Sequence, residues 1–411
     1  MKSKNNIIDK NLIMLVLIFF VYGIGQAIQE YRVLLMSSQG MSAKECGYVL
    51  ALTSLLVAVA RPLSGALADK LRSRRSIFIA TSILWIAVMI TLALFNHVRI
   101  ASFLLCAGVI PIMGICNNIN YGMVEAEGVQ VTMRDGRVDY SIIRMCLSIG
   151  YCGINFLYTP IVNRFGITAP FLITAVMVLI LLILGISQPN FGRDRVDRKT
   201  AVKEKLNFRA LFKNYFLITF VLVSFFFYLG NNTSSYLVYL LRELGMNESL
   251  VGLTSGIRVV GEILIMPFIP LIKRKVSLPM LQICACGFLI IQMIICIFAK
   301  IPWIIVGAII FSGLATGITL STNALYLRIM APEGLTTTAM SLCSFTQNLA
   351  NVIASLLGGI VVTSLGIFTL YKLSLACFVL WLILYSGTWC IGKFVMKKEP
   401  PLPMFKASPT I

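Results

Sequence analysis

Long apolar blocks, each close to the length that crosses a bilayer as a helix, constrain this chain more than any other feature. Short polar segments separate the blocks, and charged residues inside them are rare. A hydrocarbon layer holds no water, so every backbone amide must find its hydrogen-bond partner within the chain, and such blocks form helices. The twelve blocks are Leu12–Ile28, Tyr48–Ala68, Ile77–Phe95, Ile100–Val124, Ile142–Val162, Pro170–Ile186, Tyr215–Leu240, Leu250–Ile272, Leu278–Phe298, Trp303–Leu327, Leu335–Thr363 and Phe368–Ile391.

The composition indicates that lipid surrounds these helices. Of the 411 residues, 58% are apolar and only 12% are charged, whereas soluble proteins carry about 25% charged residues. A single soluble core could not bury this much apolar surface. We therefore expect an all-α polytopic membrane protein with twelve transmembrane helices, with membrane lipid as a partner.

The net charge is +19, and the basic residues behind it lie mainly on one side of the predicted membrane. If the N-terminus is cytosolic, 25 of the 35 Lys and Arg residues fall in cytosolic segments and seven in outer segments. The other three, Arg61, Arg144 and Arg258, fall within predicted spans. This bias follows the positive-inside rule. It predicts a multi-pass protein of the plasma (cytoplasmic) membrane with both termini in the cytosol, and it gives no reason to expect a nucleic-acid partner.

The longest hydrophilic stretch stands near mid-chain and divides the spans six and six. We predict an N-terminal half (residues 1–188), a cytosolic basic linker (189–213), a C-terminal half (214–391) and a cytosolic tail (392–411). Gly47 precedes Pro62 by fifteen residues, and Gly252 precedes Pro267 by the same interval, 205 residues later. This offset favours two pseudo-symmetric six-helix halves, an arrangement that places a solute site between them near the membrane midplane.

Residues typical of enzymes and metal sites are scarce. Ten of the eleven cysteines fall within spans, and His97 is the single histidine. Neither a metal-ligand spacing, a phosphate loop nor a nucleophile–base pair is recognisable. We expect no enzymatic activity, no catalytic residue, no metal and no cofactor; a proton gradient is the expected energy source.

The segment "GALADKLRSRR" resembles the loop between the second and third helices of the major facilitator superfamily, G-x-L-x-D-[RK]-x-G-[RK]-[RK]. The resemblance implies the twelve-helix fold of that superfamily. It also implies a conformational switch in which an aspartate at a helix end pairs with a neighbouring helix in one conformer only. A plain positive-inside loop is the alternative. The matching switch residues are Gly65, Asp69, Lys70, Arg74 and Arg75.

Ionisable groups inside spans are costly and usually face a cavity or a partner. Glu262 lies near the centre of the eighth span, with Arg258 four residues earlier on the same helical face. One interpretation is a structural ion pair. The other is a site that binds a polar solute and takes up a proton, which makes both residues candidates for proton coupling.

Arg144 lies a few residues into the fifth span, and Glu125 ends the fourth. A single loop joins the two helices, so the opposite charges can meet at a cytosolic mouth. The alternative for Arg144 is a guanidinium that extends along the helix to the headgroups.

The segments "VEAE…DYSIIRMCLSIGY" and "GEILIMPFIPLI" resemble the oligosaccharide:proton symporters (lactose permease and relatives) and the allied nucleoside:proton symporters. The resemblance implies that Glu125, Arg144 and Glu262 contact the solute, Arg144 through forked hydrogen bonds. Two departures leave specificity and coupling open. The ninth span offers Gln292 where the family has an arginine, and "FSGLATG" (residues 311–317) has no ionisable group where the family has a histidine and a glutamate.

Further polar or aromatic residues near the ends or centres of spans are candidates for solute binding: Gln26, Tyr228, Asn231 and Asn232. Each can instead hydrogen-bond helix to helix. We therefore expect a monomeric, proton-coupled importer of a small polar solute, either a sugar or oligosaccharide or a nucleoside, working by alternating access. Drug or metabolite efflux by the same fold is the first alternative, and a non-transporting membrane sensor is the second.

Overall fold

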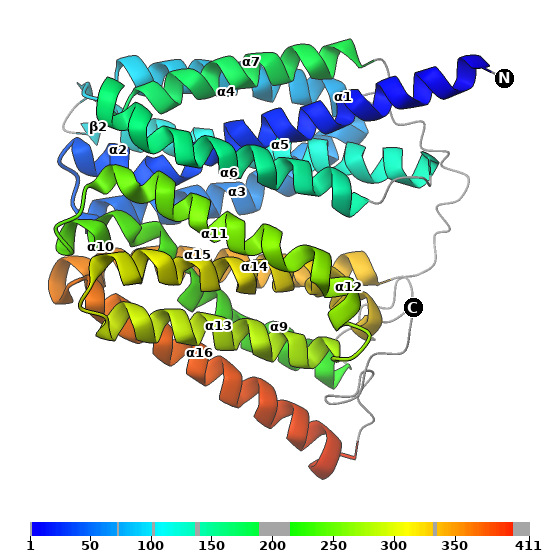
Figure 1. Cartoon of the computed structure of the whole chain (residues 1–411), viewed down its shortest axis with the longest axis vertical. Helices are drawn as coiled ribbons and strands as arrows, with labels where there is room; N and C mark the ends of the chain where they lie inside the picture. The colour runs from blue at the N-terminus through cyan, green and yellow to red at the C-terminus, as the bar shows by residue number, and fades with distance from the viewer. Residues whose placement is uncertain are drawn as a thin grey trace. The chain divides into compact units, whose positions relative to one another are not determined.

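The computed structural model describes residues 2–71, 74–100, 103–135, 140–188, 214–331 and 335–397, and these residues are almost entirely helical (Figure 1). The predicted linker (189–213) and most of the predicted tail lie outside them. The chain divides into two compact units. The first unit is Met1–Val196 with Asn247–Gly256, and the second is Asp197–Met246 with Ile257–Ile411. The sequence-based boundaries of the halves, which place 247–256 in the C-terminal half, stay a prediction.

The elements up to residue 188 all belong to the first unit. They are α1 (Lys2–Gln26), the 3₁₀ helix η1 (Ala27–Tyr31), α2 (Arg32–Ser38), α3 (Ala43–Leu71), α4 (Arg74–Leu94), β1 (Arg99–Ile100), β2 (Phe103–Leu104), α5 (Leu105–Asp135), α6 (Tyr140–Phe165) and α7 (Ala169–Ser187).

The later elements follow in chain order. They are α9 (Tyr215–Asn231), η3 (Asn232–Tyr236), α10 (Leu237–Glu243), η4 (Glu248–Leu250), α11 (Val251–Ile265), η5 (Met266–Phe268), α12 (Ile269–Ile272), α13 (Leu278–Phe298), α14 (Pro302–Met330), α15 (Thr336–Leu365), α16 (Ile367–Cys390) and the π-helix η6 (Ile391–Val395).

The predicted all-α membrane architecture is confirmed, with differences in individual spans. Among the described residues, eleven helical stretches are long and apolar enough to cross a membrane. The fourth predicted span is not among them, because Asn117, Asn118 and Asn120 lower the mean hydropathy of α5. That helix also begins at Leu105, later than predicted, since β1 and β2 pair as a short antiparallel hairpin before it.

The first stretch is longer than predicted and contains a break. It runs from Leu12 to Ser38, and the 3₁₀ helix η1 interrupts it. The stretch Tyr215–Glu243, which corresponds to the seventh predicted span, has the same construction, with η3 between α9 and α10. Both 3₁₀ helices have five residues and both following α-helices have seven, each pair separated by 205 residues in sequence. This is the offset that relates Gly47 to Gly252, so the local structure supports an internal duplication.

Capping residues set where several helices begin. The Ser42 Oγ accepts a hydrogen bond from the Glu45 amide, and the Glu45 carboxylate accepts one from the Ser42 amide at 2.8 Å. This reciprocal capping box starts α3. Ser277 caps α13 in a simpler way, by accepting from the Met280 amide.

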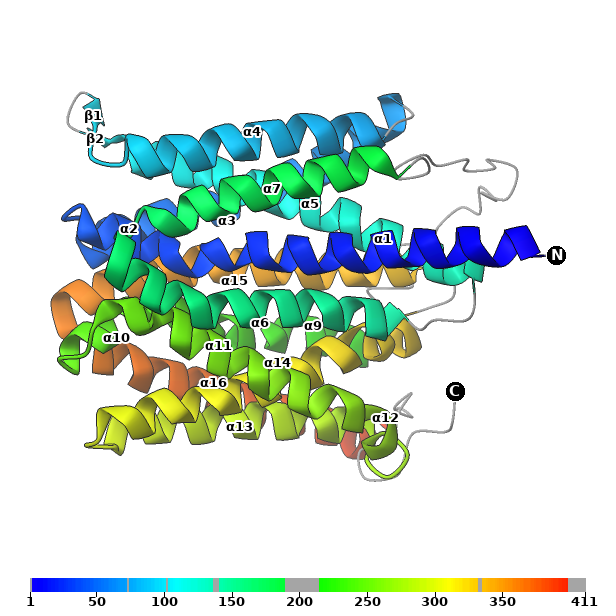
Figure 2. The ribbon, with the colours of Figure 1, turned by 45° about the horizontal axis from the view of Figure 1, so that its top comes forward.

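Within the first unit, α1 packs against α5, α6 and α7, and α4 packs against α7 (Figure 2). Glycines allow the closest approach, because a Cβ at Gly150 of α6 would lie 2.3 Å from the Phe20 carbonyl oxygen of α1. Small residues at such crossings are typical of membrane helices. In the second unit, α9 packs against α15 and α16, and α13 packs against α14 and α16.

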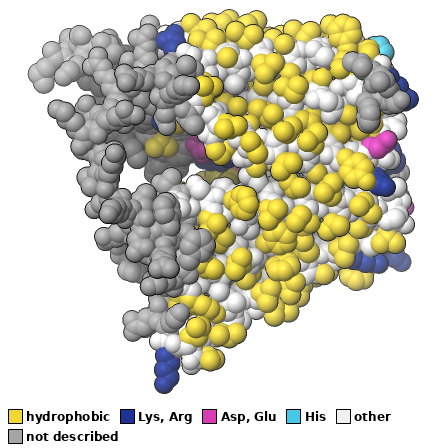
Figure 3. All heavy atoms as spheres, turned by 180° about the vertical axis from the view of Figure 1, so that it is seen from behind, with side chains coloured by type: hydrophobic (Ala, Val, Ile, Leu, Met, Phe, Trp, Pro, Cys, Tyr) yellow, Lys and Arg dark blue, Asp and Glu magenta, His cyan; other side chains and the backbone are white. Residues whose placement is uncertain are grey.

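Apolar side chains also dominate the described surface. Figure 3 shows hydrophobic side chains over most of the visible face, with few charged ones among them. Large apolar side chains such as Ile13, Leu222 and Ile383 are more than half exposed. Exposure of such an apolar surface to water is unfavourable, whereas contact with lipid tails is not.

Candidate functional site

The first unit holds an ion pair between α5 and α6. The Arg144 Nη1 lies 3.2 Å from the Glu125 Oε1 and donates a hydrogen bond to it. The structure therefore brings together the two charges that the sequence placed on adjacent helices. Their side chains are 21% and 36% exposed, respectively, so the pair remains accessible to a small solute.

Tyr121, one turn before Glu125 on α5, joins this pair into a triangle. The Arg144 Nη1 donates to the Tyr121 hydroxyl at 2.5 Å, and that hydroxyl donates to the Glu125 Oε1 at 3.1 Å. The sequence reasoning missed Tyr121, although its i, i+4 spacing to Glu125 was a usable signal.

The Tyr121 ring also contacts three other side chains. The guanidinium carbons of Arg61 on α3 and Arg144 each lie 5.9 Å from the ring centroid. The Tyr22 ring of α1 lies 5.9 Å away, centroid to centroid, and its hydroxyl donates to the Asn117 side chain at 2.8 Å. We call Arg61, Tyr121, Glu125 and Arg144 the Tyr121 cluster.

A second carboxylate lies at the break in the first helical stretch. The Tyr151 hydroxyl of α6 donates to the Glu30 Oε1 of η1 at 2.5 Å. Gln26 is partly buried at the end of α1, immediately before the break. Breaks of this kind in membrane helices expose backbone groups and often mark hinges or solute sites.

In the second unit, α11 carries both Arg258 and Glu262, each partly buried. The segment 311–317 of α14 packs on this part of α11 at very short range. A Cβ at Gly313 would lie 1.7 Å from the Arg258 carbonyl oxygen and 3.0 Å from the Glu262 amide nitrogen. A larger side chain at Gly313 would therefore separate the two helices.

The predicted polar residues of α9 and η3 lie in different surroundings. The Tyr228 hydroxyl lies 3.7 Å from the Cys343 Sγ of α15. Asn231 is exposed at the end of α9. Asn232 donates to the Ser355 hydroxyl at 2.9 Å and to the Asn351 carbonyl at 3.2 Å, so its amide joins η3 to α15.

A buried amide cluster in the second unit escaped the sequence reasoning. The Gln282 Nε2 of α13 donates to the Thr322 Oγ1 and the Asn323 Oδ1 of α14, both at 2.9 Å. Gln282 is 3% exposed. Nothing in the spacing of these residues distinguishes them from other polar residues inside spans.

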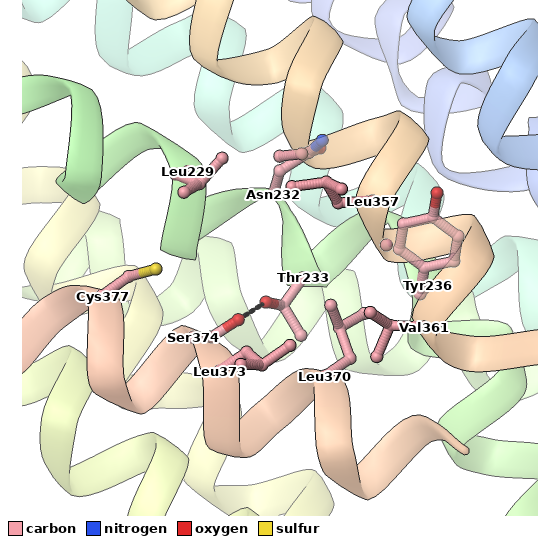
Figure 4. A pocket seen from close by; sticks show the side chains of 12 residues that line it. Leu229, Asn232, Thr233, Tyr236, Leu357, Val361, Leu370, Leu373, Ser374 and Cys377 are labelled. Carbon is pink, nitrogen blue, oxygen red and sulfur yellow. Dashed lines mark hydrogen bonds between the residues drawn. The ribbon is translucent and has the colours of Figure 1, made fainter. Parts of the chain in front are cut away.

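A cavity of about 150 Å³ lies between η3, α15 and α16 (Figure 4). Leucine, valine and alanine form half of its twelve lining residues, and a hydrogen bond between Thr233 and Ser374 crosses one wall. Asn232 reaches its edge, but none of the ionisable candidates lines it. The cavity therefore suits apolar groups better than a polar solute.

The switch residues are only partly described. Gly65, Asp69 and Lys70 belong to α3, but their side chains lie outside the described residues, as do residues 72–73. Arg75 at the start of α4 donates to the Ile186 carbonyl of α7 at 2.6 Å. Among the described residues, no group of three His, Cys, Asp or Glu side chains is placed to hold a metal ion.

Two helical units with duplicated breaks and, among the described residues, eleven apolar stretches form a multi-pass membrane architecture of the major facilitator fold. The chain belongs to the MFS_1 like family, which it matches over residues 12–373. As predicted, the family and the structural neighbours are transporters and not enzymes.

Solved structures of three transporters resemble the chain along nearly its whole length. A mutant of the nucleoside transporter NupG has a TM-score of 0.74 at 15% identity, covering 93% of this chain and 99% of its own. A mutant of the peptide transporter POT has a TM-score of 0.72 at 15% identity, covering 93% and 95%. A D-xylose-proton symporter has a TM-score of 0.68 at 15% identity, covering 97% and 98%. No curated protein matches the chain by sequence.

Proposed function

We propose that this transporter imports a small polar organic solute, a sugar or a nucleoside, together with protons. The observation that carries the proposal is the accessible Glu125–Arg144 pair, bridged by Tyr121 between two membrane helices. A paired carboxylate and guanidinium can exchange their mutual hydrogen bonds for the hydroxyl or carbonyl groups of a solute. The similar nucleoside transporter and D-xylose-proton symporter support this solute class.

Each unit carries candidate groups for solute binding. In the first unit the Tyr121 cluster offers a forked donor, an acceptor and an aromatic face. In the second unit, Glu262 and Tyr228 supply an acceptor and a ring, while Gln26 and Asn231 lie beside the two helix breaks. Asn232 is a weaker candidate, because α15 already engages its amide.

Proton coupling requires a carboxylate whose proton affinity differs between two conformations, since a ligand shifts an equilibrium only by differential interaction. Glu262 on α11, with Arg258 one turn away, is our first candidate for this role. Glu30 is the second, because the Tyr151 hydroxyl already donates to its carboxylate.

The remaining parts of the proposal concern the whole chain. Both termini and the linker 189–213 would lie in the cytosol, and the monomer would work in the plasma membrane. Alternating access would involve the switch residues Gly65, Asp69, Lys70, Arg74 and Arg75.

Uptake of labelled sugars and nucleosides by cells that express the protein tests the function. We expect accumulation above cells carrying an empty vector, and loss of that accumulation when a protonophore collapses the gradient. Accumulation that rises with the protonophore would instead indicate export, the efflux alternative. No movement of any solute in either direction would contradict transport of this class.

The variant Glu262→Gln tests the coupling site. It should still exchange labelled for unlabelled solute across proteoliposome membranes, but it should lose accumulation driven by an imposed proton gradient. The matched variant is Glu30→Gln, measured in the same two assays. Full accumulation by Glu262→Gln, with loss in Glu30→Gln, would move the proton site to η1.

A further inference from the structure

Arg61 is an arginine inside a membrane-spanning helix. It belongs to the apolar stretch Ala43–Ser64 and stands ten residues before the end of α3 at Leu71. A charged side chain inside a span is costly and usually faces a cavity or a partner.

The contacts of Arg61 show which residues lie beside its side chain. The guanidinium carbon lies 5.9 Å from the centroid of the Tyr121 ring, where the aromatic face attracts a cation. The side chain is exposed, and within the described parts of the chain no carboxylate lies within ion-pair distance of it. Arg61 thus contacts the Tyr121 ring without forming an ion pair to a carboxylate among the described residues.

The Tyr121 cluster holds two arginines and one carboxylate. Arg61 and Arg144 contribute two positive charges, and Glu125 contributes one negative charge. Glu127 lies two residues after Glu125, on the opposite side of α5. Glu30 lies on η1, where its carboxylate accepts a hydrogen bond from the Tyr151 hydroxyl of α6.

We propose that Arg61 and Arg144 form an oxyanion subsite for a carboxylate or phosphate group of the transported solute. This inference rests on the proposed function and narrows its substrate class to acidic solutes, such as a sugar acid or a nucleoside phosphate. Both guanidinium carbons lie 5.9 Å from the centroid of the same ring, so Tyr121 holds the two cations beside one side chain. Planar guanidinium groups bind carboxylate and phosphate oxygens through paired hydrogen bonds.

Thermal unfolding of the purified protein tests the subsite with solutes that differ only in charge. The pairs are glucose with glucuronate and uridine with uridine 5′-monophosphate; inorganic phosphate and benzoate are added alone. We expect the acidic member of a pair to stabilise the protein at lower concentration than the neutral member. Arg61→Gln should weaken this effect by about tenfold, and Arg61→Lys should give an intermediate loss because it keeps the charge without the fork.

The matched control is Arg164→Gln, which removes an exposed arginine over Phe165 at the far end of α6. It should keep the preference for acidic solutes. The ligand-free unfolding temperature of each variant reports folding separately. Equal stabilisation by charged and neutral members, or no shift that depends on Arg61 with any anion, would overturn the proposal.

A lipid headgroup could supply the same oxyanion, so the measurement is repeated in micelles with and without phosphatidylglycerol. A shift that depends on Arg61 with this lipid and with no soluble anion would also overturn the solute subsite. Uptake of neutral solutes without any preference for acidic ones would refute the inference while leaving the proposed function intact. Binding of acidic solutes through Arg61 without any transport would refute the proposed function and leave the anion-binding role of Arg61 intact.

Discussion

At the scale of single residues, the Arg144 guanidinium makes several contacts at once. Its Nη1 donates to both the Tyr121 hydroxyl and the Glu125 carboxylate, and its guanidinium lies against the Tyr121 ring. A side chain that extends to the headgroups would not make this set of contacts. These contacts hold the guanidinium at Tyr121 and Glu125, and a binding role for Arg144 stays a prediction.

Arg144→Lys keeps the positive charge but cannot provide two parallel donors from a planar group. We expect solute uptake to fall by about tenfold or more, because a hydrogen bond to a charged group contributes roughly 1.5–3 kcal/mol. Uptake and membrane abundance are measured together. Arg164→Lys on the same helix should remain active, and near-normal uptake by Arg144→Lys would restore the headgroup interpretation.

Tyr121→Phe removes the hydroxyl between Arg144 and Glu125 and leaves the ring beneath both arginines. We expect the apparent affinity for solute to weaken by about two- to tenfold, since a neutral hydrogen bond contributes roughly 0.5–1.5 kcal/mol. Concentration dependence of uptake is the measurement. Tyr48→Phe, a change at an exposed tyrosine of α3, is the control. A variant indistinguishable from wild type would show that the hydroxyl does not organise the cluster.

At the scale of elements, the contact between α11 and α14 holds the segment that carries Arg258 and Glu262. Gly313 allows the α14 backbone to meet the Arg258 carbonyl, and Gly317 does the same one turn later. Motion of α11 would have to carry α14 with it, because interfaces this close do not deform continuously.

Gly313→Ala should separate these helices, since its Cβ would lie 1.7 Å from the Arg258 carbonyl oxygen. Overpacking typically costs roughly 1–3 kcal/mol, so we expect a lower unfolding temperature in detergent together with reduced uptake. Gly307→Ala on the same helix provides the comparison, because nothing lies within 4 Å of its added Cβ. Equal stability of the two variants would contradict the close contact.

At the scale of the whole molecule, the orientation proposed from the basic residues can be checked by labelling with a maleimide that cannot cross membranes. A cysteine at His97, exposed after α4, should react in intact cells. A cysteine at Thr200, in the predicted cytosolic linker, should react only after permeabilisation. Cys390, the exposed native cysteine among the described residues, is first changed to serine in both variants. The reverse pattern would invert the topology.

The apolar blocks and the spacing of 205 residues already predicted the helices, their membrane setting and a duplicated plan. These properties follow from local chain chemistry, because lipid leaves a backbone no alternative to internal hydrogen bonding. Helix ends were harder to predict. Both the break at η1 and the hairpin before α5 depend on packing and pairing that no hydropathy pattern records.

Which side chains meet was decided by tertiary structure. The sequence placed Glu125 and Arg144 on adjacent helices, but helix rotation and crossing set their distance and brought in Tyr121 from α5 and Arg61 from α3. Tertiary structure also explains two of the glycines of α14, because the α11 backbone packs directly against them. Such contacts join residues far apart in the chain, so their energies depend on three-dimensional packing, whereas the apolar blocks act through their own length and composition.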